Sequence, residues 1–471
     1  MKALLVSTYD LGRQPFGLAS PAAWLKAAGF DVTCVDVAKQ PLADDVVAAA
    51  DIVAFYLPMH TATRLAAPLV GTVRRLNPPA RVCAYGLYAP LNGELLKQLG
   101  VDAVFGGEFE QELTTWALQA GRKPEASLKA CATHRDTFVA QAFRPAKTVA
   151  QAFRPPRLPR LHFLVPDRSG LPPLTKYATL QMPDGTRRAV GYTEASRGCK
   201  HLCRHCPVVP IYNGQFRIVQ PEVVLADIAA QIDAGARHVT FGDPDFFNGP
   251  THAMRIVESL HAAHPDISFD VTIKIEHLLK HRELLPRLQE SGCAFITSAV
   301  ESIDDEVLAI LEKRHTRADF IDAVALCRAA GIALVPTFVA FHPWISLRGY
   351  CELLDVISDL DLVDHVAPIQ LAIRLLIPEG SLLLTHERMR PFISAFDSKT
   401  LTHRWIHPDP RVDALHGDVT RIIGSRVSAD RRAVFDEIST LAHARAGIPR
   451  RSTRPARARA TVPYLNEPWY C

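Results

Sequence analysis

The sequence lacks the features that would place a protein in a membrane, outside the cell or on nucleic acid. No run approaches the roughly 18 consecutive apolar residues of a membrane span. The beginning, "MKALLVSTYD", has no long hydrophobic region followed by a small-residue cleavage site. The 53 basic and 49 acidic residues nearly cancel, so the surface as a whole does not attract nucleic acid or anionic lipid. We therefore expect a cytoplasmic protein with neither a membrane nor a nucleic-acid partner.

The cysteines do not show the pattern of a disulfide framework. There are ten cysteines in 471 residues, and three of them fall within residues 199–206. This distribution argues against a disulfide framework and favours a metal or redox site in a reducing compartment. Cys293, Cys327 and Cys351 lie in apolar contexts, which predicts core positions. Because a domain averages roughly 150 residues, the length predicts two or three domains.

The first 120 residues alternate β-rich runs such as "KALLVS" and "DIVAFYLP" with helical patterns such as "PAAWLKAAG". This alternation predicts parallel strands joined by crossover helices, hence an α/β, doubly wound, flavodoxin-like domain over residues 1–120. No G-x-G-x-x-G fingerprint follows the first strand, so we do not expect a dinucleotide. His60 is the only histidine in this region, at the end of the predicted third strand, where it could ligate a cofactor or simply cap a loop.

Three further segments follow. Residues 121–190 are proline-dense and contain the direct repeat "VAQAFRP", which we interpret as a local duplication in a linker. Residues 191–395 predict a partial (β/α)6 barrel, whose chemistry lies at the carboxyl ends of its strands. Residues 396–471 predict a mostly helical extension, with an arginine- and proline-rich linker and a tail ending in cysteine. The six predicted barrel strands are residues 191–195, 238–243, 268–275, 295–301, 333–341 and 366–373.

The stretch "SRGCKHLCRHCP" carries the most informative motif. Cys199, Cys203 and Cys206 are spaced C-x3-C-x2-C, directly after the first predicted barrel strand. A structural zinc site needs four ligands, and although His201 and His205 could complete one, no second knuckle follows. Three thiolates can instead hold three irons of a [4Fe-4S] cluster and leave the fourth iron open. A zinc-stabilised binding or regulatory module remains the alternative.

This motif, after the first strand of a β/α barrel, resembles the radical SAM superfamily. The resemblance implies that S-adenosylmethionine chelates the open iron. Gly242 and Asp243, in "FGDPDFF", match the segment that contacts the amino group of the methionine moiety. Glu301 and Ser302, in "SAVES", match the segment that contacts the ribose. His205 stands where the superfamily usually has an aromatic residue, and its imidazole can pack against the adenine in the same way.

Four other polar residues are candidates. Lys313 and Arg314 could reach the carboxylate of the methionine moiety, or could face solvent. The segment "TIKIEH" predicts Lys274 and Glu276 on one inward face of the third barrel strand, because alternate residues of a barrel strand point inward. Such a pair could be structural or could contact the substrate.

An amino-terminal doubly wound domain ahead of the barrel resembles the cobalamin-binding type of radical SAM protein. The D-x-H-x-x-G motif that often supplies the cobalt ligand is absent, so cobalamin is a possible cofactor with His60 as a possible ligand. On this resemblance the chain would be a cobalamin-dependent radical methylase or rearrangement enzyme.

A narrower resemblance rests on the cysteine motif together with "VTFGDPDFFNGP", "TFVAFHPWISL" and the short end "EPWYC". Together they resemble a radical SAM family that includes proteins with cysteine- or selenocysteine-bearing tails and the enzyme of arsinothricin biosynthesis. The resemblance implies transfer of the 3-amino-3-carboxypropyl group of S-adenosylmethionine to trivalent arsenic, supplied as arsenite. It also implies a reductant such as a flavodoxin or ferredoxin. Because As(III) is soft and prefers thiolates, Cys471 is the residue that could hold the acceptor, although it could also belong to a disordered end.

Overall fold

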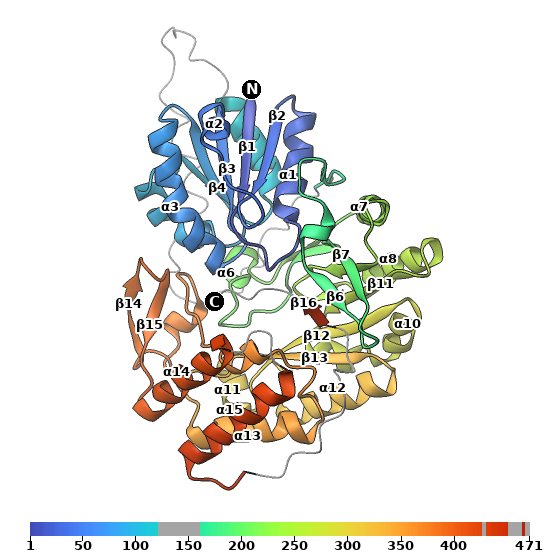
Figure 1. Ribbon diagram of the computed structural model, residues 1–471, viewed down its shortest axis with the longest axis vertical. Coiled ribbons are helices and arrows are strands. Elements are labelled where there is room, and N and C mark those ends of the chain that lie inside the picture. The colour runs from blue at the N-terminus through green and yellow to red at the C-terminus, as the bar shows by residue number, and fades with distance from the viewer. Residues whose placement is uncertain (121–160, 426–429, 451–463, 467–471) are drawn as a thin grey trace, which may run out of the picture.

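The computed structural model describes residues 1–120, 161–425 and 430–450 and the backbone of 464–466 (Figure 1). The "VAQAFRP" repeat, most of the arginine- and proline-rich segment and Cys471 lie outside the described residues. Among the described helices, none has both the length and the apolar composition of a transmembrane segment.

The amino-terminal domain is a five-stranded parallel sheet with helices on both faces (Figure 1). The third strand is buried along its whole length, as expected for a parallel strand covered on both sides. Two apolar cores lie on the two faces, so the predicted doubly wound fold is confirmed. In spatial order the strands are β2 (Asp31–Asp36), β1 (Lys2–Ser7), β3 (Ile52–Tyr56), β4 (Arg81–Tyr85) and β5 (Ala103–Phe105). The helices are α1 (Phe16–Ala27), α2 (Asp44–Ala48), α3 (His60–Leu76), α4 (Gly93–Gln98) and α5 (Phe109–Ala120).

Below this domain in Figure 1, five parallel strands form the predicted partial barrel. They are β7 (Arg187–Thr193), β10 (His238–Phe241), β11 (Ser268–Thr272), β12 (Cys293–Glu301) and β13 (Ala333–Phe338). The helices between and after them are α7 (Pro221–Asp233), α8 (Pro250–Ala263), α9 (Ile275–Lys280), α10 (Leu285–Glu290), α11 (Asp305–Ile310), α12 (Arg317–Ala329) and α13 (Leu347–Asp359). The main apolar core lies between these helices and the sheet, and it contains Cys293, Cys327 and Cys351 as predicted.

The predicted sixth barrel strand, residues 366–373, is wrong. Pro368 begins a 3-10 turn over Pro368–Leu371, and only one bridge, between Phe341 and Arg374, continues the sheet. The side-chain carbonyl of Gln370 accepts a hydrogen bond from the Phe338 backbone N–H at 3.2 Å. A side chain therefore satisfies a backbone donor on the edge strand that a sixth strand would otherwise have paired.

From residue 161 onward, the stretch expected to be a linker packs into the folded body. Strand β6 (Thr179–Gln181) pairs antiparallel with β7, and β16 (Tyr464–Asn466) pairs antiparallel with β6. The Arg168 guanidinium also forms a largely buried ion pair with Asp227 on α7, at 2.8 Å. The carboxy-terminal extension contains the hairpin β14 (Ile393–Asp397) and β15 (Thr402–Trp405), then the helices α14 (Pro410–Ser425) and α15 (Arg431–Ala446).

Candidate active site

The three cysteines lie on one loop at the carboxyl end of β7. The loop runs from the short strand β8 (Ser196–Gly198), which pairs with β9 (Phe216–Ile218), to helix α6 (Val209–Tyr212). Gly198 has a φ of 75°, and a Cβ there would lie 2.4 Å from the Tyr212 ring, so the turn before the first cysteine needs glycine. Cys199 and Cys203 are buried, and Cys206 is partly exposed.

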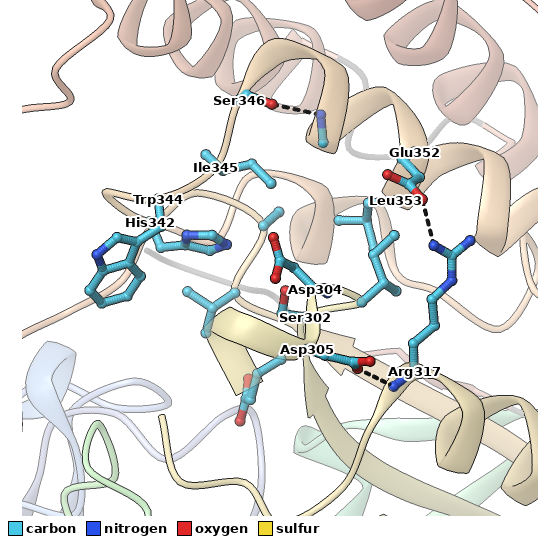
Figure 2. A pocket seen from close by; sticks show the side chains of 15 residues that line it. Ser302, Asp304, Asp305, Arg317, His342, Trp344, Ile345, Ser346, Glu352 and Leu353 are labelled. Atoms are coloured by element: carbon cyan, nitrogen blue, oxygen red, sulfur yellow. Dashed lines mark hydrogen bonds and ion pairs between the residues drawn. The ribbon is translucent and has the colours of Figure 1, made fainter. Parts of the chain in front are cut away.

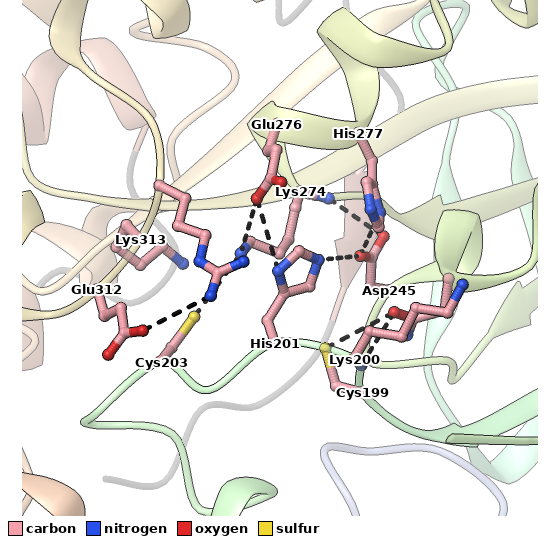
Figure 3. Close-up of polar contacts among 12 residues, drawn as sticks. Cys199, Lys200, His201, Cys203, Asp245, Lys274, Glu276, His277, Glu312 and Lys313 are labelled. Carbon is pink, nitrogen blue, oxygen red and sulfur yellow. Dashed lines mark hydrogen bonds and ion pairs between the residues drawn. The ribbon is translucent and has the colours of Figure 1, made fainter. Parts of the chain in front are cut away.

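Polar side chains lie beside two of the three thiols. The Lys274 ammonium donates to the Cys203 sulfur at 3.8 Å (Figure 3), and the Cys199 thiol donates to the side-chain oxygen of Asn248 at 3.9 Å. A cation beside a thiolate stabilises the negative charge of the metal–thiolate unit. Three cysteines on one loop, with no fourth beside them among the described residues, fit a [4Fe-4S] cluster with one open iron.

A second set of potential metal ligands overlaps the same loop. Side-chain donor atoms of Cys199, His201 and Asp245 lie within 4.8 Å of one another. Both ring nitrogens of His201 already face carboxylates, at 3.5 Å from Asp245 and 3.5 Å from Glu276 (Figure 3). The Nδ1 atom of His277 also lies 2.7 Å from the Asp245 carboxylate. His201 is therefore held in a carboxylate–histidine network, which weakens the zinc alternative that needed it as a ligand.

Lys274 and Glu276 meet, but not as predicted. Strand β11 ends at Thr272, Lys274 immediately precedes α9, and Glu276 lies in the first turn of that helix. Their charged atoms are 3.7 Å apart. The prediction of a shared strand face is therefore wrong, because the chain has already turned into a helix where alternation was assumed.

The turn after β10 contains Gly242 and Asp243. The Asp243 carboxylate accepts hydrogen bonds from the Ala195 N–H at 2.9 Å and the Ser196 hydroxyl at 2.5 Å. Burial raises the pKa of Asp243 to about 7, although these hydrogen bonds oppose the shift. Asp243 thus fastens the end of β10 to the beginning of the cysteine loop.

Because Gly242 has no side chain, the Tyr192 ring can pack against its backbone. A Cβ at this position would lie 1.8 Å from the Tyr192 hydroxyl. We expect Gly242→Ala to lower the free energy of unfolding by about 1–3 kcal/mol through overpacking. Gly417→Ala is the matched control, because a Cβ there meets nothing within 4 Å, and we expect a gain of about 0.5–1 kcal/mol in helix α14. Denaturant unfolding of both variants checks this, and equal effects would contradict it.

Glu301 ends β12 in a strained conformation and is strongly ionised. Its φ is 70°, a region that a non-glycine residue rarely adopts. Its carboxylate lies 3.4 Å from the Lys313 ammonium and 3.1 Å from the His205 ring. Burial alone would raise the pKa of Glu301, but Lys313 and His205 together lower it to about 2. The structure therefore brings the side chains of Glu301 and Lys313 together at the site. Arg314 instead pairs with Glu312, and its side chain is 55% exposed.

A cavity of about 310 Å³ begins at Glu301 and Ser302 (Figure 2). The loops after β12 and β13 line it, together with the first turn of α13. His342 lies in its wall and is only 2% exposed, with Trp344 beside it at 5.7 Å between ring centroids. Burial, with a smaller contribution from His407, lowers the pKa of His342 to about 3. The imidazole is therefore neutral at pH 7. The sequence reasoning did not single out His342 or Asn248.

The low pKa of His342 predicts an acid-sensitive fold. Between the ordinary value of 6.5 and about 3, the unfolded chain binds a proton that the folded chain does not. This part of the stability is present above pH 6.5 and is lost as the pH falls towards 3. At pH 5 the loss is about 2 kcal/mol, at 1.36 kcal/mol per pH unit. Between pH 7 and pH 5, denaturant unfolding should show a loss about 2 kcal/mol larger in the wild type than in His342→Phe, because other buried histidines such as His315 contribute to both, and equal losses would contradict it.

A second cavity, of about 210 Å³, lies between the two domains. It is smaller than the roughly 300–1,000 Å³ typical of sites for drug-sized ligands, and a corrin with its nucleotide loop is larger than such ligands. Among the described residues, its lining includes neither histidine nor cysteine. His60 begins α3, and its ring is hydrogen-bonded to the Thr400 carbonyl. The residues at this interface therefore do not fit cobalamin.

The partial barrel, its cysteine loop and the ionised Glu301 form a site at the strand ends that suits an iron–sulfur cluster and a small cofactor. Residues 193–344 match the family described as the Radical SAM superfamily, so this part of the chain is a radical SAM domain.

Other proteins share parts of this arrangement. Hopanoid C-3 methylase of Methylococcus capsulatus is 24% identical over 160 residues, which is 34% of this chain and 30% of the methylase. The chain thus matches less than a third of that relative's length. The cobalamin-dependent S-adenosylmethionine radical enzyme OxsB superposes with a TM-score of 0.67 at 14% identity, over 94% of this chain and 71% of OxsB. The radical S-adenosylmethionine methyltransferase TsrM from Kitasatospora setae gives 0.56 at 17% identity, over 76% of this chain and 70% of TsrM.

The two solved structures show that this chain shares its fold with OxsB and TsrM over most of its length. None of these three proteins is described as acting on arsenic, so the arsinothricin-type resemblance stays a prediction.

Proposed function

We propose that this chain binds a [4Fe-4S] cluster through Cys199, Cys203 and Cys206 and transfers a group from S-adenosylmethionine to a small acceptor. The observation that carries the proposal is the convergence of three features at the carboxyl end of one parallel sheet. These are the cysteine loop, the Asp243 turn and the Glu301–Lys313 pair. When bound, a [4Fe-4S] cluster would supply the electron for cleavage of a C–S bond of the sulfonium, with a flavodoxin or ferredoxin as the reductant.

The residues have separable roles in holding S-adenosylmethionine. The Glu301 carboxylate, kept ionised by Lys313, accepts the ribose hydroxyls, and Ser302 lies beside it in the same cavity. Backbone carbonyls at the Gly242 turn receive the amino group, because the Asp243 carboxylate is already bonded to Ala195 and Ser196. Lys274 and Lys313 lie beside the cysteine loop and offer cations to the carboxylate of the methionine moiety.

The comparisons favour methyl as the transferred group. Hopanoid C-3 methylase and the TsrM methyltransferase are both named for methyl transfer. Cobalamin-dependent methylation is therefore the candidate activity that the names of the similar proteins support most. Its weakness is the small cavity at the domain interface, which does not fit the corrin.

The second candidate is transfer of the 3-amino-3-carboxypropyl group to trivalent arsenic. The small volume of the cavity between the domains favours this second candidate, because the transfer needs no corrin. In a balanced reaction two electrons from the reductant enter, the C–S bond breaks to release methylthioadenosine, a C–As bond forms and one hydroxide leaves arsenous acid. The residue predicted to hold arsenic, Cys471, lies outside the described residues.

One experiment separates these outcomes. The full-length chain is reconstituted anaerobically and incubated with reductant, S-adenosylmethionine and arsenite, and the products are analysed by mass spectrometry. S-adenosylmethionine-dependent nucleoside release supports the proposal, and a protein with zinc but no iron or sulfide overturns it. Methylthioadenosine with an aminocarboxypropyl arsenical supports the second candidate. 5'-deoxyadenosine as the sole nucleoside excludes it.

A further inference from the structure

We propose that the cavity between the domains is the acceptor site, and that it takes a compact, uncharged, hydroxyl-bearing molecule rather than a corrin. This inference rests on the proposed function, since it assigns the place of the acceptor in the same reaction. The cavity lies where the strands of both sheets end. The amino-terminal domain contributes the loops after β1, β3, β4 and β5. The barrel contributes Tyr192, Gly242 and the loop that carries the cysteines.

The cavity lies next to the proposed binding site for S-adenosylmethionine. Gly242 lines it, and the Gly242 turn is the proposed site for the amino group of S-adenosylmethionine. Ser196 and Gly198, immediately before Cys199, also line it. An acceptor bound here would therefore lie beside the methionine end of S-adenosylmethionine, and the methyl and aminocarboxypropyl groups both belong to that end.

The walls of the cavity are fixed by packing between the domains. The Arg197 guanidinium from the barrel forms a buried ion pair with Glu110 of α5 at 2.7 Å. The same guanidinium lies over the rings of Phe109 and Phe163, at 5.5 and 4.9 Å from their centroids. Opening the interface to admit a corrin would expose this pair and these rings.

Aromatic rings also fill the crevice at the strand ends of the amino-terminal domain. The rings of Tyr56, Tyr85 and Phe109 pack together, with centroids 4.8 to 6.2 Å apart. Gly17 on α1 has no side chain because a Cβ there would lie 2.2 Å from the Tyr56 ring. The topological crevice of a doubly wound sheet is the usual ligand site, and here protein side chains occupy much of it.

The polar lining points to an uncharged ligand. Two acidic side chains, Asp10 and Glu194, and two basic ones, Arg13 and Arg197, line the cavity, so their formal charges cancel. Arg197 is bonded to Glu194 at 2.7 Å, and Arg13 lies over the Tyr192 ring at 4.9 Å. A charged ligand would disturb this balance in a partly buried site.

Hydroxyl groups give the lining its hydrogen-bonding capacity. Burial raises the pKa of Tyr56 and Tyr192 well above the ordinary value, so both keep their phenolic protons. A phenol can donate to a ligand oxygen and accept from a ligand hydroxyl. Arsenous acid, which is neutral at pH 7, and a small polyol such as glycerol share this chemistry and are the two probes.

The first test asks whether a corrin enters. The full-length reconstituted chain is incubated with hydroxocobalamin and passed through a desalting column, and the corrin absorption of the protein fraction is measured. We expect none to be retained, and a stoichiometric amount would overturn the inference.

The second test uses two leucine-to-tryptophan variants. Leu87→Trp fills the cavity, whereas Leu99→Trp places the same ring at a half-buried position of the same domain outside the cavity lining. The readout is the electron paramagnetic resonance spectrum of the reduced cluster. S-adenosylmethionine should change that spectrum in the wild type and in both variants. If it has no effect on the wild type, the proposed function fails rather than this inference.

Arsenous acid or glycerol is then added to the protein loaded with S-adenosylmethionine. We expect at least one probe to change the spectrum in the wild type and in Leu99→Trp. In Leu87→Trp we expect the apparent affinity for that probe to fall at least about tenfold, because the ring occupies its space. Failure of both probes in the wild type, or an unchanged response in Leu87→Trp, would overturn the inference.

Discussion

Cys203→Ser should remove most of the iron and sulfide from the reconstituted protein and abolish cleavage of S-adenosylmethionine. Cys203 is buried on the loop after β8, with the Lys274 ammonium 3.8 Å from its sulfur. Loss of an outer hydrogen-bond partner of a metal ligand typically costs 10–100-fold in metal affinity or activity, so loss of the ligand itself should cost more than about 100-fold. Iron and sulfide analysis, the visible absorption of the cluster and the rate of nucleoside release measure the effect.

The matched control is Cys327→Ala, which changes a fully buried cysteine in the core of the barrel on α12. We expect full iron content and a loss of about 1 kcal/mol in the free energy of unfolding, from the small cavity left behind. If Cys203→Ser keeps the cluster while Cys327→Ala loses it, the assignment of the ligands is wrong. One zinc per chain without sulfide would favour the zinc module instead.

Arg197→Leu should cost about 3–5 kcal/mol of the free energy of unfolding, because it leaves a buried carboxylate without its partner. Glu110 is fully buried and Arg197 is 6% exposed. A hydrogen bond of 2.8 Å and an ion-pair contact of 2.7 Å join the guanidinium to this carboxylate, and the Ser20 hydroxyl donates to it at 2.6 Å. The pair connects α5 of the amino-terminal domain to the beginning of the cysteine loop. Denaturant unfolding and calorimetry measure the cost.

The pKa of Glu110 gives this prediction a second readout. Burial alone would raise that pKa, but Arg197 lowers it below the ordinary value. Without Arg197 the raising effect of burial, the largest effect on this pKa, is opposed only by hydrogen bonds from the Ser20 hydroxyl and the backbone, so we expect the folded variant to take up a proton more readily than the unfolded chain. A carboxyl group whose pKa is raised in the folded state contributes stability at low pH. The loss in free energy of unfolding caused by Arg197→Leu, relative to the wild type, should therefore become smaller as the pH falls from 7 towards 5.

A surface pair serves as the control for Arg197. Arg421 and Asp418 on α14 are 2.8 Å apart, but the Arg421 side chain is 74% exposed. Arg421→Leu should change the free energy of unfolding by less than about 1 kcal/mol. The double variant Arg197→Leu, Glu110→Leu should recover part of the loss, since it removes the unpaired charge. A cost for Arg197→Leu no larger than for Arg421→Leu would show that the interface does not depend on the pair.

The sequence predicts the local features of the site well. The C-x3-C-x2-C spacing fixes three thiols on one loop whatever surrounds it, and an apolar strand followed by a turn places Gly242 and Glu301 at strand ends. The errors lie where a local pattern competes with a tertiary contact. Residues 366–373 have strand-like composition, but Pro368 and the Gln370 bond to Phe338 make a 3-10 turn there. Lys274 and Glu276 follow a strand pattern, yet helix α9 begins between them.

By itself the sequence determined the two α/β domains and the cysteine motif, because hydrophobic periodicity and residue spacing are local properties of the chain. Only the tertiary structure decided which charges meet. Arg197 and Glu110 are 87 positions apart, and His201 and Asp245 are brought together from different loops. It also decided the size of the cavity between the domains, which depends on how side chains from two sheets pack. That packing leaves about 210 Å³ where the fold would lead one to expect a corrin.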